Sequence, residues 1–402
     1  MYYISRIAGA FALAALGIAV WYSIVLARAD SYFRAATPET VERAVEIAPR
    51  NTDYLALRAL QLDYDGADST ELREKIAALN PYSSAPRIRL GLAAEIQGDS
   101  AKAERWLLEA ARVDHQFEPG WTLANFYFRA ERREEFWTWM RFALEVSYGD
   151  RTPAFDLCWR ASSDAGKILQ RGIPDRHEVV AAYLVYLLRT EPPQRRLPPR
   201  MATPQDVGTQ GVVDVARRLA AYHDGSDLPM LFGACDRLLA ARDSAAVEVW
   251  QMMGQAAPAG IFNGDFSTVP LNHGFDWRLI ESPGVTHVSL SAPSGHRIAF
   301  SGQQAESCSL LAQALDLKAG KHYRLHWEAR TADMKSPSGL QWRVGGQHAA
   351  LFPSEDWTPG ELTMAATEVF QVLELAYQRP IGESRTEGNV ELRQIRLVEV
   401  AP

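Results

Sequence analysis

The chain has 402 residues and a formal net charge of −7 at pH 7. This length accommodates two or three domains of about 100–200 residues each. Nucleic-acid binding needs a concentrated face of lysine and arginine, and the basic clusters here are short and isolated, so the sequence predicts no nucleic-acid partner. Three cysteines fall in different expected elements and predict neither a disulfide framework nor a metal-binding cysteine pair: Cys158, Cys235 and Cys308.

The first expected element is an apolar helix over residues 7–27, a stretch of 21 residues without a charge. About 20 helical residues match the roughly 30 Å hydrocarbon core of a bilayer. The alternative is a cleavable signal peptide, because residues 27–29 have the small-x-small pattern of a cleavage site, although its apolar segment usually spans about 7–15 residues. We expect residues 1–35 to form an uncleaved transmembrane signal anchor in a bacterial inner membrane, with the bulk of the chain in the periplasm.

Residues 36–150 contain an internal repeat of about 33 residues. One register consists of leucines at spacings of 33: Leu57, Leu90 and Leu123. A second register has spacings of 32, 34 and 33: Ala44, Ile76, Ala110 and Ala143. The period resembles that of the tetratricopeptide repeat, a pair of antiparallel helices, and the resemblance implies protein partners bound through the repeats.

The copy over residues 84–117 matches this family best. Leu90 and Gly91 match its Leu-Gly pair in the first helix, and Ala103 and Ala110 line the second helix. Small residues let two helix backbones approach closely where they cross. The resemblance implies a set of repeat-packing residues: Leu57, Leu90, Gly91, Ala103, Ala110, Leu123 and Ala143.

Residues 151–258 keep helical apolar spacing but lose the clear repeat. We expect an irregular helical continuation that caps the otherwise exposed end of the repeats. A segment with five prolines over residues 190–205 interrupts it and predicts a surface loop.

Residues 259–402 change to a period of two. In the segment 322–329, Tyr323, Leu325 and Trp327 alternate with polar residues, which is typical of a half-buried strand. Turn signals rich in Pro and Gly separate several such segments. The pattern predicts an antiparallel β-sandwich, or jelly roll, so the whole chain is expected to be multidomain, helical first and β second.

This last region resembles the jelly-roll carbohydrate-binding modules of the galactose-binding-like group. The resemblance rests on the order of five phrases: Asn263-Gly264-Asp265-Phe266, Gly274-Phe275-Asp276-Trp277, Leu311 to Leu317, Tyr323 to Trp327, and Asn389 to Val400. It implies glycan contact and a structural calcium ion, for which Asp265 and Glu391 are the candidate oxygen ligands. No other cofactor is expected.

Glycan binding by such modules uses an exposed aromatic ring. Trp357 lies in the segment SEDWTPG, outside the expected strands, and is the glycan-contact candidate. No nucleophile elbow, HExxH, P-loop or dinucleotide fingerprint occurs, and we expect no catalytic residue and no enzyme activity. His322 and His326 are expected on a solvated strand face rather than on a metal.

These features together predict a membrane-anchored envelope scaffold that binds proteins through its repeats and carries a candidate glycan module. The expected setting is exopolysaccharide assembly or export. One alternative is an assembly factor for a membrane complex, with a purely structural jelly roll. Another is a glycan-active enzyme that uses carboxylates such as Glu328 or Asp356, for which the sequence offers no pair of defined spacing.

Overall fold

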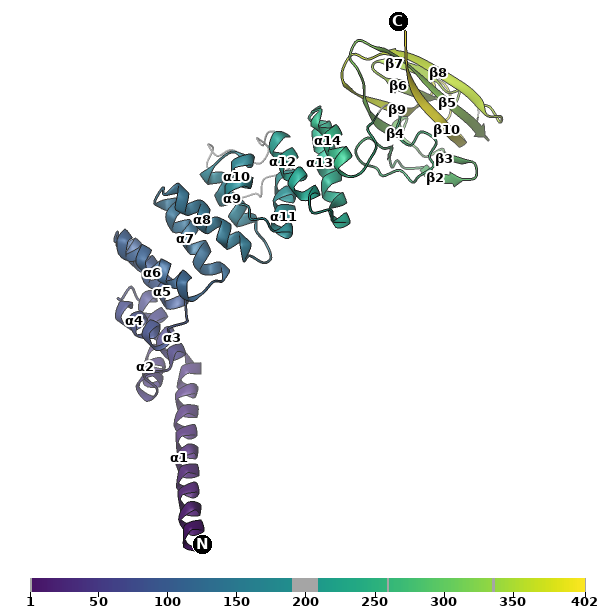
Figure 1. Cartoon of the computed structure of the whole chain (residues 1–402). Coiled ribbons are helices and arrows are strands. Elements are labelled where there is room, and N and C mark those ends of the chain that lie inside the picture. The colour runs from purple at the N-terminus through teal and green to yellow at the C-terminus, as the bar shows by residue number, and fades with distance from the viewer. Residues whose placement is uncertain (1, 190–208, 259, 335–336, 402) are drawn as a thin grey trace. The chain divides into compact units, whose positions relative to one another are not determined.

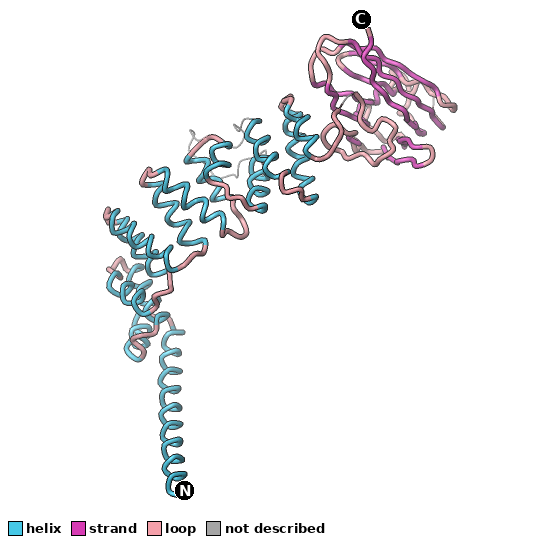
Figure 2. The backbone as a smooth tube through the Cα atoms, viewed as in Figure 1, coloured by secondary structure: helices cyan, strands magenta, loops and turns pink. Residues whose placement is uncertain are grey.

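The computed structural model describes residues 2–189, 209–258, 260–334 and 337–401. Helices form the first part of the chain and strands the second (Figures 1 and 2). The chain divides into two compact units, Met1–Ala161 with Gln170–Asp175, and Ser162–Leu169 with Arg176–Pro402. The proline-rich loop predicted over residues 190–205 lies outside the described residues.

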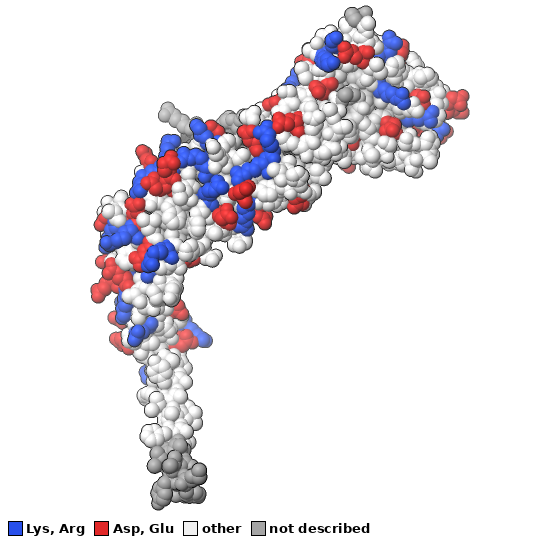
Figure 3. Space-filling model, viewed as in Figure 1, with Lys and Arg blue, Asp and Glu red and all other residues white. Residues whose placement is uncertain are grey.

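The first unit begins with α1 (Tyr2–Ala35), an unbroken helix of 34 residues. Apolar side chains along its middle face solvent, with Phe11 74% and Trp21 68% exposed, and little charge is visible there (Figure 3). Its last turns behave differently, because Ala29 is fully buried beside Tyr54 in a small core. Within the described residues, α1 is the one helix long and apolar enough to cross a membrane.

The helices that follow pack in consecutive pairs joined by short turns, as the repeat predicts (Figure 1). Side chains cap several of them: Asn51 accepts the N–H groups of Asp53 and Tyr54, and Asp99 accepts that of Lys102. The elements are α2 (Pro38–Ile47), α3 (Thr52–Tyr64), α4 (Thr70–Leu79), α5 (Ala85–Ile96), α6 (Ser100–Val113), α7 (Phe117–Arg129), α8 (Arg133–Glu145) and α9 (Thr152–Ala161).

The second helix of each pair follows the predicted register, because the residue predicted for each repeat is buried: Ala44, Ile76, Ala110 and Ala143. In the first helices Leu90 and Leu123 are buried, but Leu57 is only half-buried. The register predicted for α3 is therefore corrected, because Leu55 and Ala59 enter the core in its place. Ala103 is buried in α6, as expected of a packing residue.

Gly91 marks a close approach between α5 and α6. A Cβ atom there would lie 2.7 Å from the Leu107 side chain and 3.2 Å from the Ala103 carbonyl oxygen. In the next repeat Gly120 has this role, since its Cβ would lie 2.6 Å from the Phe142 ring.

The second unit opens with helices that bury a continuous apolar surface, including Cys235. Burial raises the pKa of the Cys235 thiol to about 12, so the group stays protonated and behaves as a small apolar residue. The elements after α9 are α10 (Ala165–Arg171), α11 (His177–Leu188), α12 (Thr209–Ala220), the short 3-10 helix η2 (Gly225–Asp227), α13 (Leu228–Ala240) and α14 (Ala245–Met252).

The strands form two antiparallel sheets, which confirms the predicted sandwich. One sheet has the order β1-β4-β9-β6-β7 and the other β2-β3-β10-β5-β8. The strands are β1 (Arg278–Leu279), β2 (Val285–Ser291), β3 (Ser294–Ser301), β4 (Ser307–Asp316), β5 (His322–Ala332), β6 (Leu340–Val344), β7 (Gln347–Ala350), β8 (Thr358–Ala365), β9 (Phe370–Gln378) and β10 (Glu387–Val400).

The sandwich core centres on three tryptophans. Trp342 from β6 lies 6.1 Å from Trp277 and 6.0 Å from Trp327 of β5, measured between ring centroids. All three rings belong to one buried cluster that both sheets share. Tyr323, Leu325 and Trp327 are buried, and the residues between them are half-buried, as the alternation predicts.

Helix α13 contacts the first loop of the sandwich directly. The Asp236 carboxylate accepts hydrogen bonds from the Gly274 N–H at 2.8 Å and from Arg278 Nη2 at 2.7 Å. The Trp250 ring of α14 and the Phe275 ring lie 5.8 Å apart between centroids in a T-shaped arrangement. The boundary predicted at residue 259 therefore separates helices from strands inside one compact unit.

Candidate functional site

A charged cluster covers the outer face of β3, β10 and β5. Glu391 stands opposite Arg297 on one side and Arg330 on the other. Its Oε1 accepts from Arg297 Nη2 at 2.6 Å and its Oε2 from Arg330 Nε at 2.7 Å, and its side chain is 5% exposed. Burial raises the pKa of Glu391, but the hydrogen bonds from Arg330 and Arg297 outweigh it and hold the pKa below its usual value.

Trp357 belongs to the same cluster. The Arg393 guanidinium lies 4.0 Å from the centroid of the Trp357 ring, and that of Arg330 lies 5.0 Å from it. Arg393 in turn donates to Glu328 at 2.6 Å. The ring is half-buried and already engaged in cation–π contacts, so a sugar would compete with two arginines for it. We call these six residues the arginine–tryptophan cluster: Arg297, Glu328, Arg330, Trp357, Glu391 and Arg393.

The predicted calcium site is not assembled. Both oxygens of Glu391 face guanidinium groups, whose charge disfavours a cation there. Asp265 follows Gly264, which accepts a hydrogen bond from the N–H of Ile395, four residues further along β10 and roughly 13 Å away for an extended strand. Among the described residues no group of three or more His, Cys, Asp or Glu is placed to hold a metal ion.

The carboxylates considered for an enzyme have different surroundings. Glu328 is paired with Arg393, and Asp356 is exposed in the loop before β8. His322 and His326 are half-buried on the outer face of β5, and His326 Nδ1 lies 3.9 Å from Glu361.

A histidine pair that the sequence did not suggest lies in the second sheet. His287 Nδ1 is 3.0 Å from His296 Nε2, and the Phe266 ring stacks on His296 at 5.2 Å. His296 is fully buried, and among the described residues its Nδ1 has no hydrogen-bond partner. Burial, with a smaller contribution from His287, lowers the pKa of His296 to about 4.

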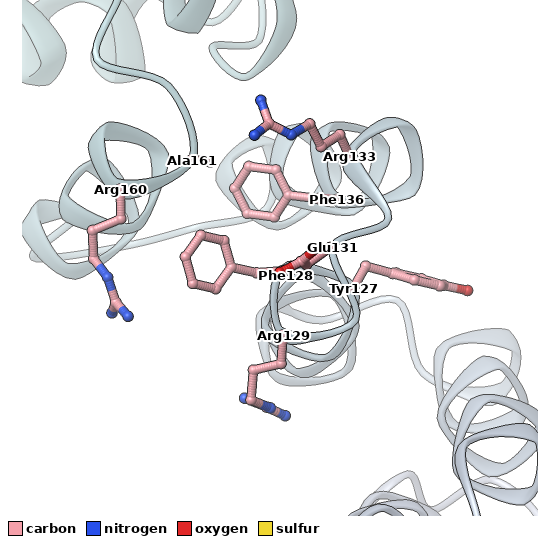
Figure 4. Close-up of a pocket in the computed structure, with 8 residues that line it drawn as sticks. All are labelled: Tyr127, Phe128, Arg129, Glu131, Arg133, Phe136, Arg160 and Ala161. Carbon is pink, nitrogen blue, oxygen red and sulfur yellow. The ribbon is translucent and has the colours of Figure 1, made fainter.

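The repeat region contains a hollow of about 460 Å³ where the end of α7, the start of α8 and the end of α9 converge (Figure 4). We call it the α7–α8 pocket. The Phe128 and Phe136 rings lie 5.8 Å apart between centroids, with their planes inclined by 55°. Its complete lining is Tyr127, Phe128, Arg129, Glu131, Arg133, Phe136, Arg160 and Ala161.

Four tryptophans lie in or beside the repeat helices, and none of them lines this pocket. Trp137 is buried, whereas Trp106, Trp121 and Trp139 are half-buried. Trp121 stacks with Phe117 at 5.8 Å beside a smaller hollow of about 180 Å³.

A larger hollow of about 710 Å³ lies over β4 and β9 beside α13. Ala312, Ala314 and Phe370 form part of its apolar lining, and Val372 is 58% exposed there. The ion pair between Arg242 and Glu368 belongs to its rim. Arg242 and Arg278 also line this hollow, and the exposed Val372 side chain is its most accessible apolar surface.

No protein-family model matches the chain, and no curated protein matches it. Solved structures are similar to its separate parts. PilF of Pseudomonas aeruginosa matches with 12% identity over 57% of this chain and 96% of that chain, with a TM-score of 0.30. A structure titled for a CBM4 module matches with 12% identity over 35% of this chain and 99% of that chain, with a TM-score of 0.27.

A third structure is TmCBM61 in complex with β-1,4-galactotriose, with 17% identity over 36% of this chain and 97% of that chain, and a TM-score of 0.24. With TM-scores below 0.5, these likenesses carry no functional argument. The architecture itself defines the class: the chain joins an N-terminal apolar helix, a tetratricopeptide-like helical region and a β-sandwich like that of carbohydrate-binding modules.

Proposed function

We propose that this protein is a non-enzymatic adaptor of the bacterial envelope, anchored in the inner membrane by α1, that binds protein partners through its helical repeats. The observation that carries the proposal is the construction of α1. One helix exposes apolar side chains along its middle and buries Ala29 in the repeat core at its end. A helix of this kind joins a binding region directly to a bilayer.

The same observation supports an anchor over a signal peptide. Cleavage after Ala29 would cut inside α1 and remove a fully buried residue from the first core cluster. It would leave a void beside Ala44 and Tyr54, and buried voids cost stability. Phe33, further along α1, stacks with Tyr54 at 4.9 Å between centroids, so the end of this helix acts as part of the repeat.

Topology is therefore the first expected result. A periplasmic reporter fused after residue 35 is expected to be active, because the proposal places the chain that follows α1 in the periplasm. The full chain purified from membranes is expected to retain residues 1–29 by mass spectrometry of its N-terminal peptides. A mature chain that begins at Asp30 would contradict the anchor.

For the sandwich, the proposal is contact with a polysaccharide during its assembly or export. The hollow over β4 and β9 supports this, since apolar side chains there can pack on the apolar face of a sugar. The second candidate function is an assembly factor whose sandwich is purely structural. The arginine–tryptophan cluster favours this candidate, because it engages Trp357 and ties three strands together by ion pairs.

Affinity electrophoresis of the full chain through gels that contain a panel of neutral and acidic polysaccharides separates these candidates. Glycan contact predicts retardation by at least one polysaccharide, with a dissociation constant in the micromolar to millimolar range, equivalent to about −8 to −4 kcal/mol. Val372→Glu places a charge in the hollow and is expected to weaken the retardation. The matched control is Val288→Glu, at an exposed valine of β2 in the other sheet.

Trp357→Ala completes the test. If Trp357→Ala abolishes the retardation and Val372→Glu does not, the glycan site lies at the Trp357 ring rather than in the hollow. If no polysaccharide in the panel retards the chain, the glycan proposal fails and the assembly-factor candidate is preferred.

A further inference from the structure

We propose that the α7–α8 pocket binds an acidic segment of a protein partner, with partner carboxylates paired to Arg133 and Arg160 and an apolar side chain held against the half-buried Phe128 ring. The inference rests on the proposed adaptor function and names the chemistry of its partner.

Among the described residues, two arginines that line the pocket, Arg133 and Arg160, take no part in the ion pairs around it. The neighbouring carboxylates are already paired: Glu95 with Arg129, Glu104 and Glu135 with Arg132, and Glu134 with Arg171. In the described part of the chain, neither Arg133 nor Arg160 has a carboxylate within ion-pairing distance. One acidic residue, Glu131, lines the pocket. The pocket therefore carries unpaired positive charge on a chain whose net charge is −7.

The two guanidinium groups reach the pocket from different helices. Arg133 begins α8 and Arg160 lies near the end of α9. The Arg160 guanidinium lies 5.0 Å from the centroid of the Phe128 ring, a cation–π contact that holds the group beside the hollow. Figure 4 shows the Phe128 and Phe136 rings between the two arginines in that view. Planar guanidinium groups suit carboxylates, which they bind through two parallel hydrogen bonds.

The aromatic residues favour a peptide over a sugar. Stacking on a pyranose needs an open, flat ring face, whereas Phe128 and Phe136 are inclined by 55° and Phe136 is 1% exposed. The half-buried Phe128 ring, backed by the buried Phe136, can accept the side chain of a phenylalanine or leucine at an inclined angle. A volume of about 460 Å³ holds a few side chains rather than a long chain. The geometry points to a short motif that combines acidic residues with one apolar residue.

Isothermal titration calorimetry tests the inference with the full chain in a neutral detergent that contains no sugar. The probe is the capped pentapeptide Asp-Glu-Phe-Glu-Asp, and its comparison is the isosteric amide peptide Asn-Gln-Phe-Gln-Asn. We expect the acidic peptide to bind, more weakly as salt rises, and the amide peptide to bind at least roughly tenfold less tightly. Arg133→Gln and Arg160→Gln are each expected to weaken acidic-peptide binding by roughly tenfold.

Two further variants sharpen the result. Glu131→Gln removes the carboxylate of the pocket and is expected to tighten binding several-fold. Arg105→Gln removes an exposed arginine of α6 that lies outside the pocket lining and is expected to leave the affinity unchanged. Opposite effects at Glu131 and Arg160 would not follow from a general loss of folding.

Several outcomes would overturn the inference. These are no binding of the acidic peptide, equal binding of the two peptides, or equal losses in Arg105→Gln and Arg160→Gln. Binding of trigalacturonate with the same dependence on Arg133 and Arg160 would assign the pocket to an acidic glycan instead. If Arg133→Gln/Arg160→Gln still captures the same membrane proteins as the unchanged chain, the adaptor function stands and the pocket is not its docking site.

Discussion

Replacement of Trp342 by alanine is expected to lower the free energy of unfolding of the sandwich by about 3–5 kcal/mol. The ring is fully buried, and it lies about 6 Å from both Trp277 and Trp327, so its removal leaves a cavity that neither sheet can close. The measurement is denaturant unfolding of the full chain, with hydrogen exchange of β5, β6 and β9 to locate the loss. Exchange is needed because a chain of several parts need not unfold in one step.

The matched control for this prediction is Trp357→Ala. That tryptophan lies outside the core and contacts two arginines, so its loss is expected to cost only about 1 kcal/mol. If both variants lose the same small amount of unfolding free energy, the packing of the three tryptophans does not stabilise the core as the structure indicates.

Acidification is expected to remove roughly 3 kcal/mol of stability through His296 alone. Its pKa in the folded protein is about 4, below the value of about 6.5 for an unfolded histidine. Between these two values the unfolded chain binds a proton that the folded chain does not bind. The contribution is therefore fully present above pH 6.5 and is lost progressively as the pH falls toward 4.

The check is the pH dependence of unfolding in the wild-type chain and in His296→Asn. The variant is expected to be less stable throughout, but its stability should fall less steeply between pH 6.5 and 4. Carboxylates also titrate at the lower end of this window. The effect of His296 is therefore read from the difference between the wild-type curve and the His296→Asn curve. Parallel curves for His296→Asn and the wild type would refute the assignment.

Short-range periodicity was enough to predict both architectures. The 33-residue repeat placed Ala110 and Ala143 at buried crossings, and the alternation around Trp327 placed a strand with its apolar face inward. These patterns succeed because each residue's burial depends on its own helix or strand. Leu57 was misplaced because Leu55 and Ala59 are the residues of α3 that pack against Ile76 of α4, so the buried face of this helix is offset from the 33-residue spacing.

The side-chain partners could not be predicted in this way. Glu391 lies 94 residues from Arg297 and 61 from Arg330 along the chain, and its carboxylate was assigned to calcium because strand register is not visible in the sequence. Trp357 was identified correctly as lying in a loop, but Arg393 reaches its ring from another strand. The α7–α8 pocket likewise needs three helices to bring Arg133 and Arg160 to one place.

In the proposed anchor, the continuity of α1 fixes the orientation of the first repeats about the helix axis. Each residue of an α-helix turns the chain by about 100° and advances it by about 1.5 Å. Because α1 runs without a break from Trp21 to Ala29, the angle about the helix axis between two of its faces is fixed. One face would meet neighbours in the bilayer, and the other meets α2. The number of residues between them, rather than a flexible tether, then decides which side of the first repeats a neighbouring membrane protein encounters.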